Sequence, residues 1–184
     1  MFNADLNEFS SPEALAFYEE NKHADASKLL LKYANDPLKK AFALQLESRK
    51  RAEFKLPTWF KNHEIVFPLK LNLEQSSSEI TANYKTKLLN FASSADLTGG
   101  TGIDSWQFAL HSQNHIFIEP NNDLIELAKH NFAALGITNT RFFCGTAEEF
   151  LAQNKTHFDV IFADPSRRTS TGSKAVVLEE YSPN

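Results

Sequence analysis

The second half of this 184-residue chain alternates between apolar, strand-like runs and amphipathic, helical ones, and this alternation restricts the possible folds more than any other feature. Strand-like runs lie at residues 91–97, 115–120, 140–145 and 158–166. The helical segments between them lie at 104–112, 121–136 and 146–154. Spacing of this kind is typical of parallel strands joined by helices. We therefore predict an α/β fold with a parallel sheet and covering helices.

The first half of the chain is predicted to be helical. Three stretches carry apolar residues at helical spacing: 10–22, 24–34 and 37–54. Ser11 is placed to cap the first of them, with Pro12 at the first helical position. Three short amphipathic helices are typical of a small cap or bundle rather than a complete enzyme.

A change of pattern separates the two halves. Residues 55–78 contain Pro57 and Pro68, and they predict an extended or irregular linker that packs against the sheet. A capped helix is then expected within 76–92. We predict two domains, a helical cap with its linker over residues 1–70 and a sheet domain over residues 71–184.

The sequence places four strands in the sheet domain, whereas a doubly wound sheet normally has more. We therefore expect a partial sheet, preceded by a small all-helical domain, in a chain that is part of a longer protein. Hydrophobic residues make up 42% of the chain and include sixteen phenylalanines, which is enough for a real core.

The net charge of −4 argues against a strong, non-specific binder of nucleic acids. The densest basic cluster consists of Arg49, Lys50, Arg51 and Lys55. We expect it to be a solvated helix end favoured by the helix dipole, with a nucleic-acid-facing patch as the alternative.

Other features of the composition limit where the protein is located and which chemistry it can perform. No apolar run approaches the ~20 residues of a membrane span, and the acidic N-terminus is unlike a signal peptide. A single cysteine fits a reducing cytoplasm, and Cys144, in an apolar run, is expected to be a buried structural thiol. Trp59 and Trp106 are expected to pack in the core or between domains. The six histidines form no pattern that predicts metal binding.

The loop after the first predicted strand, "TGGTG", holds three glycines at 98–102. A dinucleotide-binding loop has the pattern G-x-G-x-x-G, but Ser105 stands where the third glycine would be. A phosphate-binding P-loop requires Lys and Ser or Thr after its last glycine, where Ile103 and Asp104 stand. S-adenosylmethionine has no phosphate, so neither requirement applies to it.

Two acids end consecutive predicted strands. Asp96 suits the cationic methionine end of S-adenosylmethionine, and Glu119 suits a bidentate grip on its ribose hydroxyls. Glycines let the backbone approach such a ligand without a Cβ atom in the way. Because the carboxyl ends of parallel strands meet at one edge of a sheet, we expect the site to lie there.

Four segments resemble, in order, the motifs of class I S-adenosylmethionine-dependent methyltransferases: "ADLTGGTGIDSWQFA", "IFIEPNNDLIELAKHNFAALGI", "RFFCGTAEEFL" and "FDVIFADPSRR". They are most similar to the RNA-modifying branch, including trimethylguanosine synthases and bacterial methyltransferases with a THUMP-like domain. The resemblance implies a Rossmann-like methyltransferase sheet, S-adenosylmethionine as cofactor and a base in RNA as substrate.

The resemblance also implies the cofactor-binding residues. Those that would line the methionine end are Asp96, Thr98, Gly99, Gly100 and Gly102. Glu119 would hold the ribose, with Pro120 and Asn121 beside the adenosine. Thr146 and Ala147 would border the adenine, where the family's usual acid is absent and Glu148 stands one turn later.

Substrate residues follow from the same resemblance. The preceding segment, with Gln75, Ser76 and Thr81, would close over the cofactor or the substrate. Asp164 and Pro165 occupy the position of the family's catalytic strand end, where an acceptor atom binds the hydrogens of the target amine.

The chain departs from the family pattern directly after this position. Ser166 replaces a second proline, and Arg167 replaces the aromatic residue that would stack on a flipped base. Arg167 or Arg168 would contact phosphate or stack on a base. This departure leaves the methylated base and atom open.

Two hypotheses that assign the protein to other functional classes stay open. One is a non-catalytic module, in which a helical adaptor and a nucleotide-binding half-sheet serve binding or assembly. The other is an NAD-dependent oxidoreductase, which Ser105 in place of the third glycine disfavours.

Overall fold

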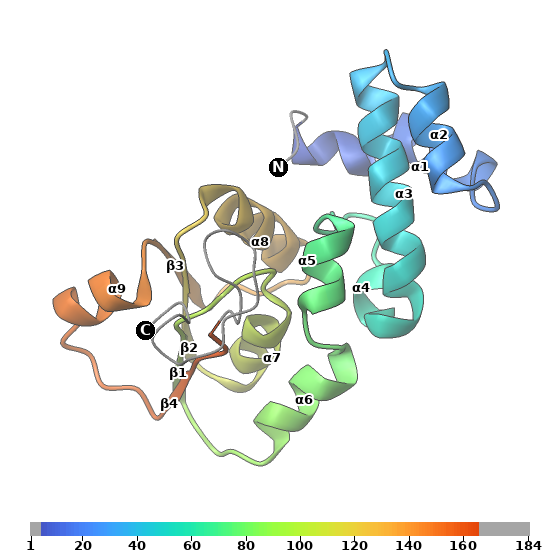
Figure 1. The fold of residues 1–184 in the computed structure, drawn as a ribbon. Helices are drawn as coiled ribbons and strands as arrows, with labels where there is room; N and C mark the ends of the chain where they lie inside the picture. The colour runs from blue at the N-terminus through green and yellow to red at the C-terminus, as the bar shows by residue number, and fades with distance from the viewer. Residues whose placement is uncertain (1–4, 166–184) are drawn as a thin grey trace, which may run out of the picture.

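The computed structural model describes residues 5–165 (Figure 1). Ser166, Arg167 and Arg168 lie outside the described residues. The amino-terminal elements are the 3-10 helix η1 (Leu6–Ser10) and the helices α1 (Pro12–Glu20), α2 (Ala26–Lys32), α3 (Pro37–Lys55), α4 (Pro57–Lys61), α5 (Lys70–Gln75) and α6 (Glu79–Lys87). The alternating elements are β1 (Ser93–Asp96), α7 (Ile103–His111), β2 (Asn114–Glu119), α8 (Asn122–Ala134), β3 (Thr140–Cys144), α9 (Ala147–Gln153) and β4 (Val160–Phe162).

Side-chain caps begin the first helices. The Ser11 hydroxyl accepts a hydrogen bond from the Ala14 N–H at 3.2 Å, and Pro12 opens α1, as predicted. Asp25 and Asp36 cap α2 and α3 in the same way. Satisfying the free N–H groups of a first turn stabilises a helix by about 1 kcal/mol. The helices pack around a cluster that includes Phe9, Phe17, Tyr18, Leu29 and Phe42.

The linker is more regular than the sequence predicts. Two short helices, α4 and α5, form within it, and residues 62–69 connect them. Pro57 takes the first position of α4, where a missing N–H costs no helical hydrogen bond. The prediction of an extended or irregular linker is therefore wrong for these two helices.

Two buried amides hold the connection between α4 and α5. Gln45 of α3 donates to the Phe67 carbonyl at 2.7 Å and accepts from the Phe67 N–H at 2.8 Å. Asn131 of α8 pairs with both backbone groups of Val66 in the same way, at 2.8 and 2.9 Å. Because one amide comes from α3 and the other from α8, the linker packs against the helices of both regions, and its predicted packing against the sheet region is confirmed.

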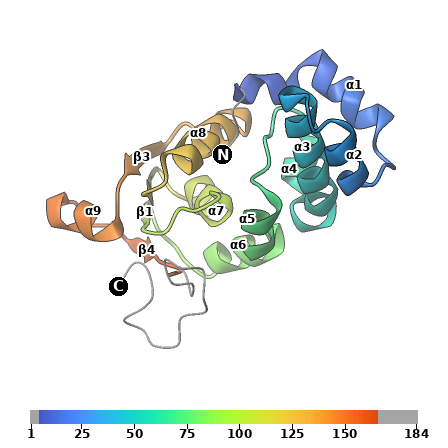
Figure 2. The same ribbon diagram turned by 45° about the horizontal axis from the view of Figure 1, so that its top comes forward.

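The sheet is parallel, with the strand order β3-β2-β1-β4. Neighbouring residues of a strand face opposite sides, so Phe117 of β2 packs against Phe132 of α8 while Ile118 packs near Phe150 of α9. Helices therefore cover both faces, and α1–α3 lie to one side of the sheet (Figures 1 and 2). This arrangement confirms the predicted α/β fold.

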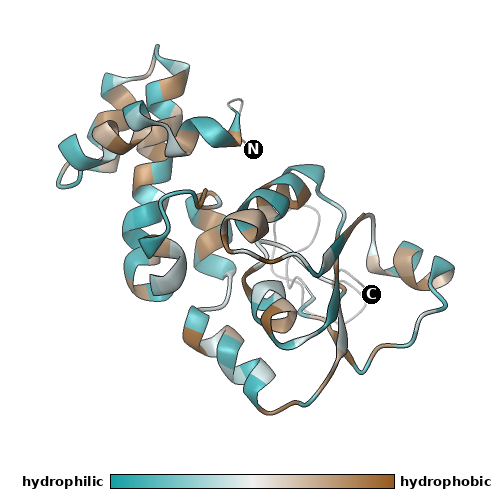
Figure 3. Ribbon diagram, turned by 180° about the vertical axis from the view of Figure 1, so that it is seen from behind, coloured by the Kyte–Doolittle hydropathy of each residue, from teal (hydrophilic) through white to brown (hydrophobic). Residues whose placement is uncertain are grey.

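The core spans the helical region and the sheet region. Trp59 of α4 packs edge to face on Trp106 of α7, with 5.8 Å between ring centroids, and both are buried as predicted. Hydrophilic residues interrupt the apolar ones along the helices (Figure 3). Over residues 5–165, no helix is long and apolar enough to cross a membrane.

The basic cluster of α3 is engaged within the chain. Arg49 is buried, so the prediction of a solvated helix end is wrong for this residue. Its guanidinium donates to the carbonyls of Ile65 and Phe60 and lies against three aromatic rings, which suits a planar cation. The other three make these contacts: Lys50 with the Ala24 carbonyl, Arg51 with Glu74, and Lys55 with the carbonyls of Leu73 and Glu74.

Candidate functional site

A cavity of about 830 Å³ opens at the carboxyl edge of the sheet. Twelve residues singled out in the sequence line it: Gln75, Ser76, Asp96, Thr98, Gly99, Gly100, Glu119, Pro120, Thr146, Ala147, Asp164 and Pro165. Gly102, Thr81 and Asn121 are not among its lining residues. The fold thus brings together residues from α5, β1, β2, α9 and the segment after β4, and the most distant two, Gln75 and Pro165, are 90 positions apart in the chain.

Asp96 is a buried residue that holds the start of the glycine loop by hydrogen bonds. It ends β1, is only 1% exposed, and accepts hydrogen bonds from the Thr98 N–H at 2.9 Å, the Thr98 hydroxyl and the Ser105 hydroxyl. Burial raises the pKa of Asp96 to about 6, against the opposing effect of these hydrogen bonds. The sequence shows Ser105 only as a missing glycine, and the structure adds its role as a partner of Asp96.

Glu119 holds the same loop from the neighbouring strand. One carboxylate oxygen accepts from the Gly100 N–H at 2.8 Å, and the other accepts from the Asn121 N–H at 2.9 Å. A carboxylate oxygen has a second lone pair, so each can still accept a hydrogen bond from a ligand. Gly100 has φ +54°, which a glycine adopts without strain.

A hydrogen-bonded chain joins the end of β4 to the glycine loop. The Asp164 N–H donates to the Thr98 hydroxyl at 2.8 Å, and that hydroxyl donates to Asp96 at 3.2 Å. The Asp164 residue itself is exposed beside the cavity. Residues from the first and fourth strands are therefore held side by side, with one carboxylate buried and the other open to a ligand.

Packing beneath the loop requires two of its glycines. A Cβ atom on Gly99 would lie 2.5 Å from the Phe117 ring. Gly102 is the N-cap residue directly before α7 and has φ +84°, and a Cβ atom there would lie 3.1 Å from the Phe132 ring. The sequence predicts that these glycines allow close approach of a ligand, and the structure shows that they also fit the loop onto the sheet.

Several lining residues were not anticipated from the sequence: Asn72, Ser77, Leu97, Thr101, Ile103, Asp104 and Phe162. Asn72 stands three residues before Gln75, so helical spacing could have pointed to it. Glu148 lines the cavity although it stands one turn later than the family's acid. Among the described lining residues there are five carboxylates and no lysine or arginine.

Cys144 is exposed, so the prediction of a buried thiol is wrong. It is the last residue of β3, which pairs only with β2 among the described strands and therefore lies at the sheet's edge. An apolar run predicts a strand, but the position of that strand in the sheet decides how deeply its end is buried. Within residues 5–165, no group of three or more His, Cys, Asp or Glu residues is placed to hold a metal ion.

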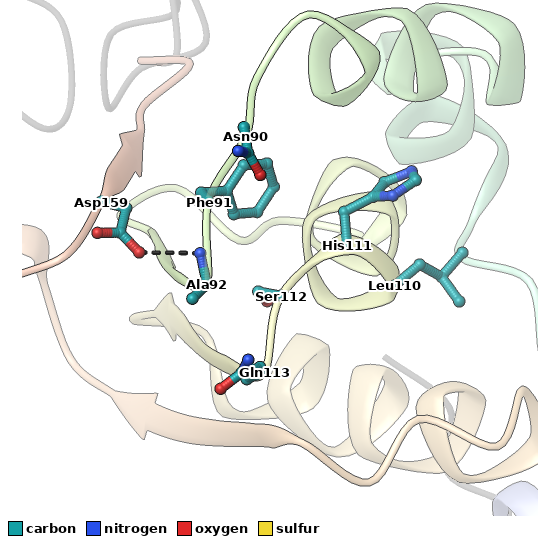
Figure 4. Close-up of a pocket in the computed structure, with 8 residues that line it drawn as sticks. All are labelled: Asn90, Phe91, Ala92, Leu110, His111, Ser112, Gln113 and Asp159. Atoms are coloured by element: carbon teal, nitrogen blue, oxygen red, sulfur yellow. Dashed lines mark hydrogen bonds between the residues drawn. The ribbon is translucent and has the colours of Figure 1, made fainter.

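A second depression, of about 540 Å³, lies at the amino edge of the sheet (Figure 4). Its lining includes the residues directly before β1, β2 and β4, namely Ala92, Gln113 and Asp159. Asp159 accepts hydrogen bonds from the N–H groups of Ala92 and Ser93 at 2.9 and 2.8 Å, and these bonds lower its pKa. None of the predicted site residues lines this depression.

The strand order and the cavity together define the class of fold. Strands in the order 3-2-1-4 form the first part of a Rossmann-like sheet, in which ligands bind outside the carboxyl ends of the strands. The described residues have this arrangement, and similarity to a solved methyltransferase structure matches it. No family model matches the chain.

Two proteins are similar to the chain over most of its length. It is 30% identical over 129 residues to an uncharacterized RNA methyltransferase of Mycoplasma mobile, an alignment that covers 67% of this chain and 35% of that protein. It is 28% identical, with a TM-score of 0.72, to the crystal structure of a candidate methyltransferase from Porphyromonas gingivalis, over 91% of this chain and 43% of that one. The chain thus spans less than half the length of either relative, and both relatives are described as methyltransferases.

Proposed function

We propose that this protein is an S-adenosylmethionine-dependent methyltransferase that modifies a base in RNA. The observation that carries the proposal is the convergence of the glycine loop, Asp96, Glu119 and Asp164 on one cavity. Both similar proteins are described as methyltransferases, and one of them as an RNA methyltransferase. The narrower resemblance to trimethylguanosine synthases and THUMP-like proteins stays a prediction.

The residues of the cavity fit S-adenosylmethionine. Its volume of about 830 Å³ lies in the range of small-molecule sites. Glu119 offers free lone pairs to the ribose diol, with Pro120 beside it, and Thr146 and Ala147 border the same cavity as the candidate adenine end. Five carboxylates without a lysine or arginine among the described lining residues suit a ligand that carries ammonium and sulfonium charges.

The reaction needs little from the protein beyond alignment. Bound S-adenosylmethionine supplies a methyl group activated by the positive charge on its sulfur. Asp164 lies at the cavity with its backbone fixed by Thr98, so its exposed carboxylate would accept hydrogen bonds from an amine of the substrate. Holding donor and acceptor in one geometry removes much of the entropic barrier of a bimolecular transfer. Gln75 and Ser76 line the same cavity and would contact the acceptor.

The domain division and the compartment extend this proposal. We assign residues 1–70 to a helical cap with its linker, and residues 71–184 to the domain that binds the cofactor. Because the chain has one cysteine and its proposed substrate is RNA, we place the protein in the cytoplasm. Arg167 and Arg168, which lie outside the described residues, would contact the RNA.

Calorimetric titration with S-adenosylhomocysteine and with NAD tests the cofactor. We expect the chain to bind S-adenosylhomocysteine and not NAD. Incubation with methyl-labelled S-adenosylmethionine and either ribosomal or transfer RNA then tests the substrate. Absence of S-adenosylhomocysteine binding would overturn the proposal. Binding without label in RNA would overturn the RNA substrate and favour the reading of a non-catalytic module.

A further inference from the structure

Lys85, in α6, contacts three walls of the cavity although it is not among the lining residues. Its ammonium donates to the Ser77 hydroxyl at 3.0 Å and to Asp104 at 2.8 Å, and it lies 4.7 Å from the centroid of the Phe162 ring. Ser77 lies between α5 and α6, Asp104 in the first turn of α7, and Phe162 at the end of β4. One side chain therefore connects the segment over the cavity with the glycine-loop helix and the strand that leads to Asp164.

The Lys85–Asp104 pair is shielded more than an ordinary surface ion pair. The side chain of Lys85 is 27% exposed and that of Asp104 is 15% exposed. Solvent screens such a pair less than an exposed one, so the geometry it imposes is held more firmly. Asp104 also lies close enough to the buried Asp96 for its negative charge to raise the pKa of that carboxyl. Lys85 thus balances a charge at the base of the proposed cofactor site.

The wall that Lys85 holds is anchored at its other end by a second lysine. Lys55 of α3 donates to the carbonyls of Leu73 and Glu74 at 2.6 and 3.2 Å. Between these anchors lie Gln75 and Ser76, which line the cavity together with Ser77 and with Asn72 one turn earlier. This wall belongs to a helix of six residues, which is too short to hold its position by itself.

We propose that Lys85 is a positioning residue for the cofactor, which fixes the spacing between the α5–α6 wall and the glycine loop. Through Ser77 it holds the wall, and through Asp104 it holds the first turn of α7. The inference rests on the proposed function, because it concerns the same cavity. It adds a residue that does not line the cavity and acts through two residues that do, Ser77 and Asp104.

Substitution of Lys85 and of its neighbour Lys87 tests this role. Lys85→Met keeps an unbranched side chain and removes the ammonium with its contacts to Ser77, Asp104 and the Phe162 ring. Lys87→Met changes an exposed lysine of the same helix. We expect the dissociation constant of S-adenosylhomocysteine, measured by calorimetry, to rise about tenfold in Lys85→Met, the effect of a lost charged hydrogen bond. It is expected to stay unchanged in Lys87→Met and to be largely restored in Lys85→Arg.

The pairing with Asp104 gives a readout that a general loss of stability would not produce. If both substitutions break the same bridge, the double variant K85M/D104N will bind S-adenosylhomocysteine about as weakly as the weaker single variant. Equal affinity in the wild type and Lys85→Met, or equal losses in Lys85→Met and Lys87→Met, would overturn the inference. If Lys85→Met does not fold, Ser77→Ala takes its place, and unchanged affinity there overturns it. A wild type that binds no S-adenosylhomocysteine would overturn the proposed function instead.

Discussion

The two edges of the sheet use the same kind of hydrogen bond, but they differ in what the bond builds. At the amino edge, Asp159 accepts from the N–H groups of Ala92 and Ser93. At the carboxyl edge, Glu119 accepts from the N–H groups of Gly100 and Asn121. The first set fastens the start of β1 to the residue before β4 and leaves a depression of about 540 Å³. The second set holds loops over a cavity of about 830 Å³.

The difference shows that a carboxylate bonded to backbone N–H groups does not identify a ligand site. At the amino edge, Asp159 is exposed and its bonds join neighbouring strand ends. At the carboxyl edge, the buried Asp96 stands beside Glu119 and both bind one loop, which turns back at Gly100 and Gly102 with positive φ. The combination of buried acids and a loop of this shape makes the carboxyl edge the candidate site.

The largest expected effect is on ligand affinity, which should change when the carboxyl edge is altered but not when the amino edge is. In Glu119→Ala the glycine loop loses the carboxylate that holds it, and the ribose of the ligand loses its hydrogen-bond acceptor. We expect S-adenosylhomocysteine to bind about a hundredfold more weakly, which is the combined effect of two lost charged hydrogen bonds. Asp159→Ala removes an acid with the same kind of partners at the other edge and should leave the affinity unchanged. Calorimetry on both variants measures the difference, and similar losses in the two would contradict it.

The second prediction concerns pH, because burial shifts the pKa of Asp96 at one edge and of His115 at the other, with opposite effects on stability. Burial raises the pKa of Asp96 from 3.8 to about 6, so its contribution to stability is present below about pH 3.8 and is lost as the pH rises towards 6. Burial lowers the pKa of His115, near the amino end of β2, from 6.5 to about 3. Its contribution is present above about pH 6.5 and is lost as the pH falls towards 3.

Between pH 4 and 6 these two contributions offset each other in the wild type. In Asp96→Asn only the His115 contribution remains, so the free energy of unfolding should rise with pH by about 2 kcal/mol relative to the wild type. In His115→Gln it should fall over the same range by a similar amount. Urea unfolding at pH 4, 5 and 6 measures both slopes. If the pH profile of a variant matches that of the wild type, the group replaced in that variant does not contribute to the pH dependence of stability.

The contrast between the edges also shows how far the sequence leads. Parallel strands bring their carboxyl ends together in any fold of this kind, so Asp96, Glu119 and Asp164 could be assigned to one site from their places after strand-like runs. The glycines of the loop could be identified for the same reason. These inferences need only local pattern and chain order. The cavity is lined by the three acids and by Gly99 and Gly100, but not by Gly102.

What the sequence did not predict depends on contacts between distant residues. Ser105 beneath Asp96 and Lys85 beside Asp104 can be paired only when α6 and α7 are placed against β1. The burial of Arg49 requires the Tyr18 ring of α1 together with the Phe60 and Phe67 rings of the linker. The exposure of Cys144 requires its strand to lie at an edge of the sheet. Periodicity fixes an element's type, whereas its neighbours fix which side chains become buried.

The smallest expected effect is on the free energy of unfolding when either of two glycines with positive φ is replaced. One of them lies in the loop at the site and the other lies away from it. Gly136, directly after the end of α8, has φ +73°, and a Cβ atom there would meet nothing within 4 Å. Gly136→Ala should therefore cost only the backbone strain of a left-handed conformation, about 1 kcal/mol. Gly102→Ala carries the same strain and also presses a Cβ atom to 3.1 Å from the Phe132 ring, so it should cost somewhat more.

Binding then separates the two positions more clearly than stability does. The Gly102 N–H donates to the Gly99 carbonyl at 2.9 Å, and Gly102 directly precedes α7, so strain at this residue is transmitted to the loop that Glu119 and Asp96 hold. We expect Gly102→Ala to weaken S-adenosylhomocysteine binding and Gly136→Ala to leave it unchanged. Chemical unfolding and calorimetry on the same two samples measure both quantities. Weakened binding in Gly136→Ala would show that the cavity responds to general loss of stability and not to the geometry of its loop.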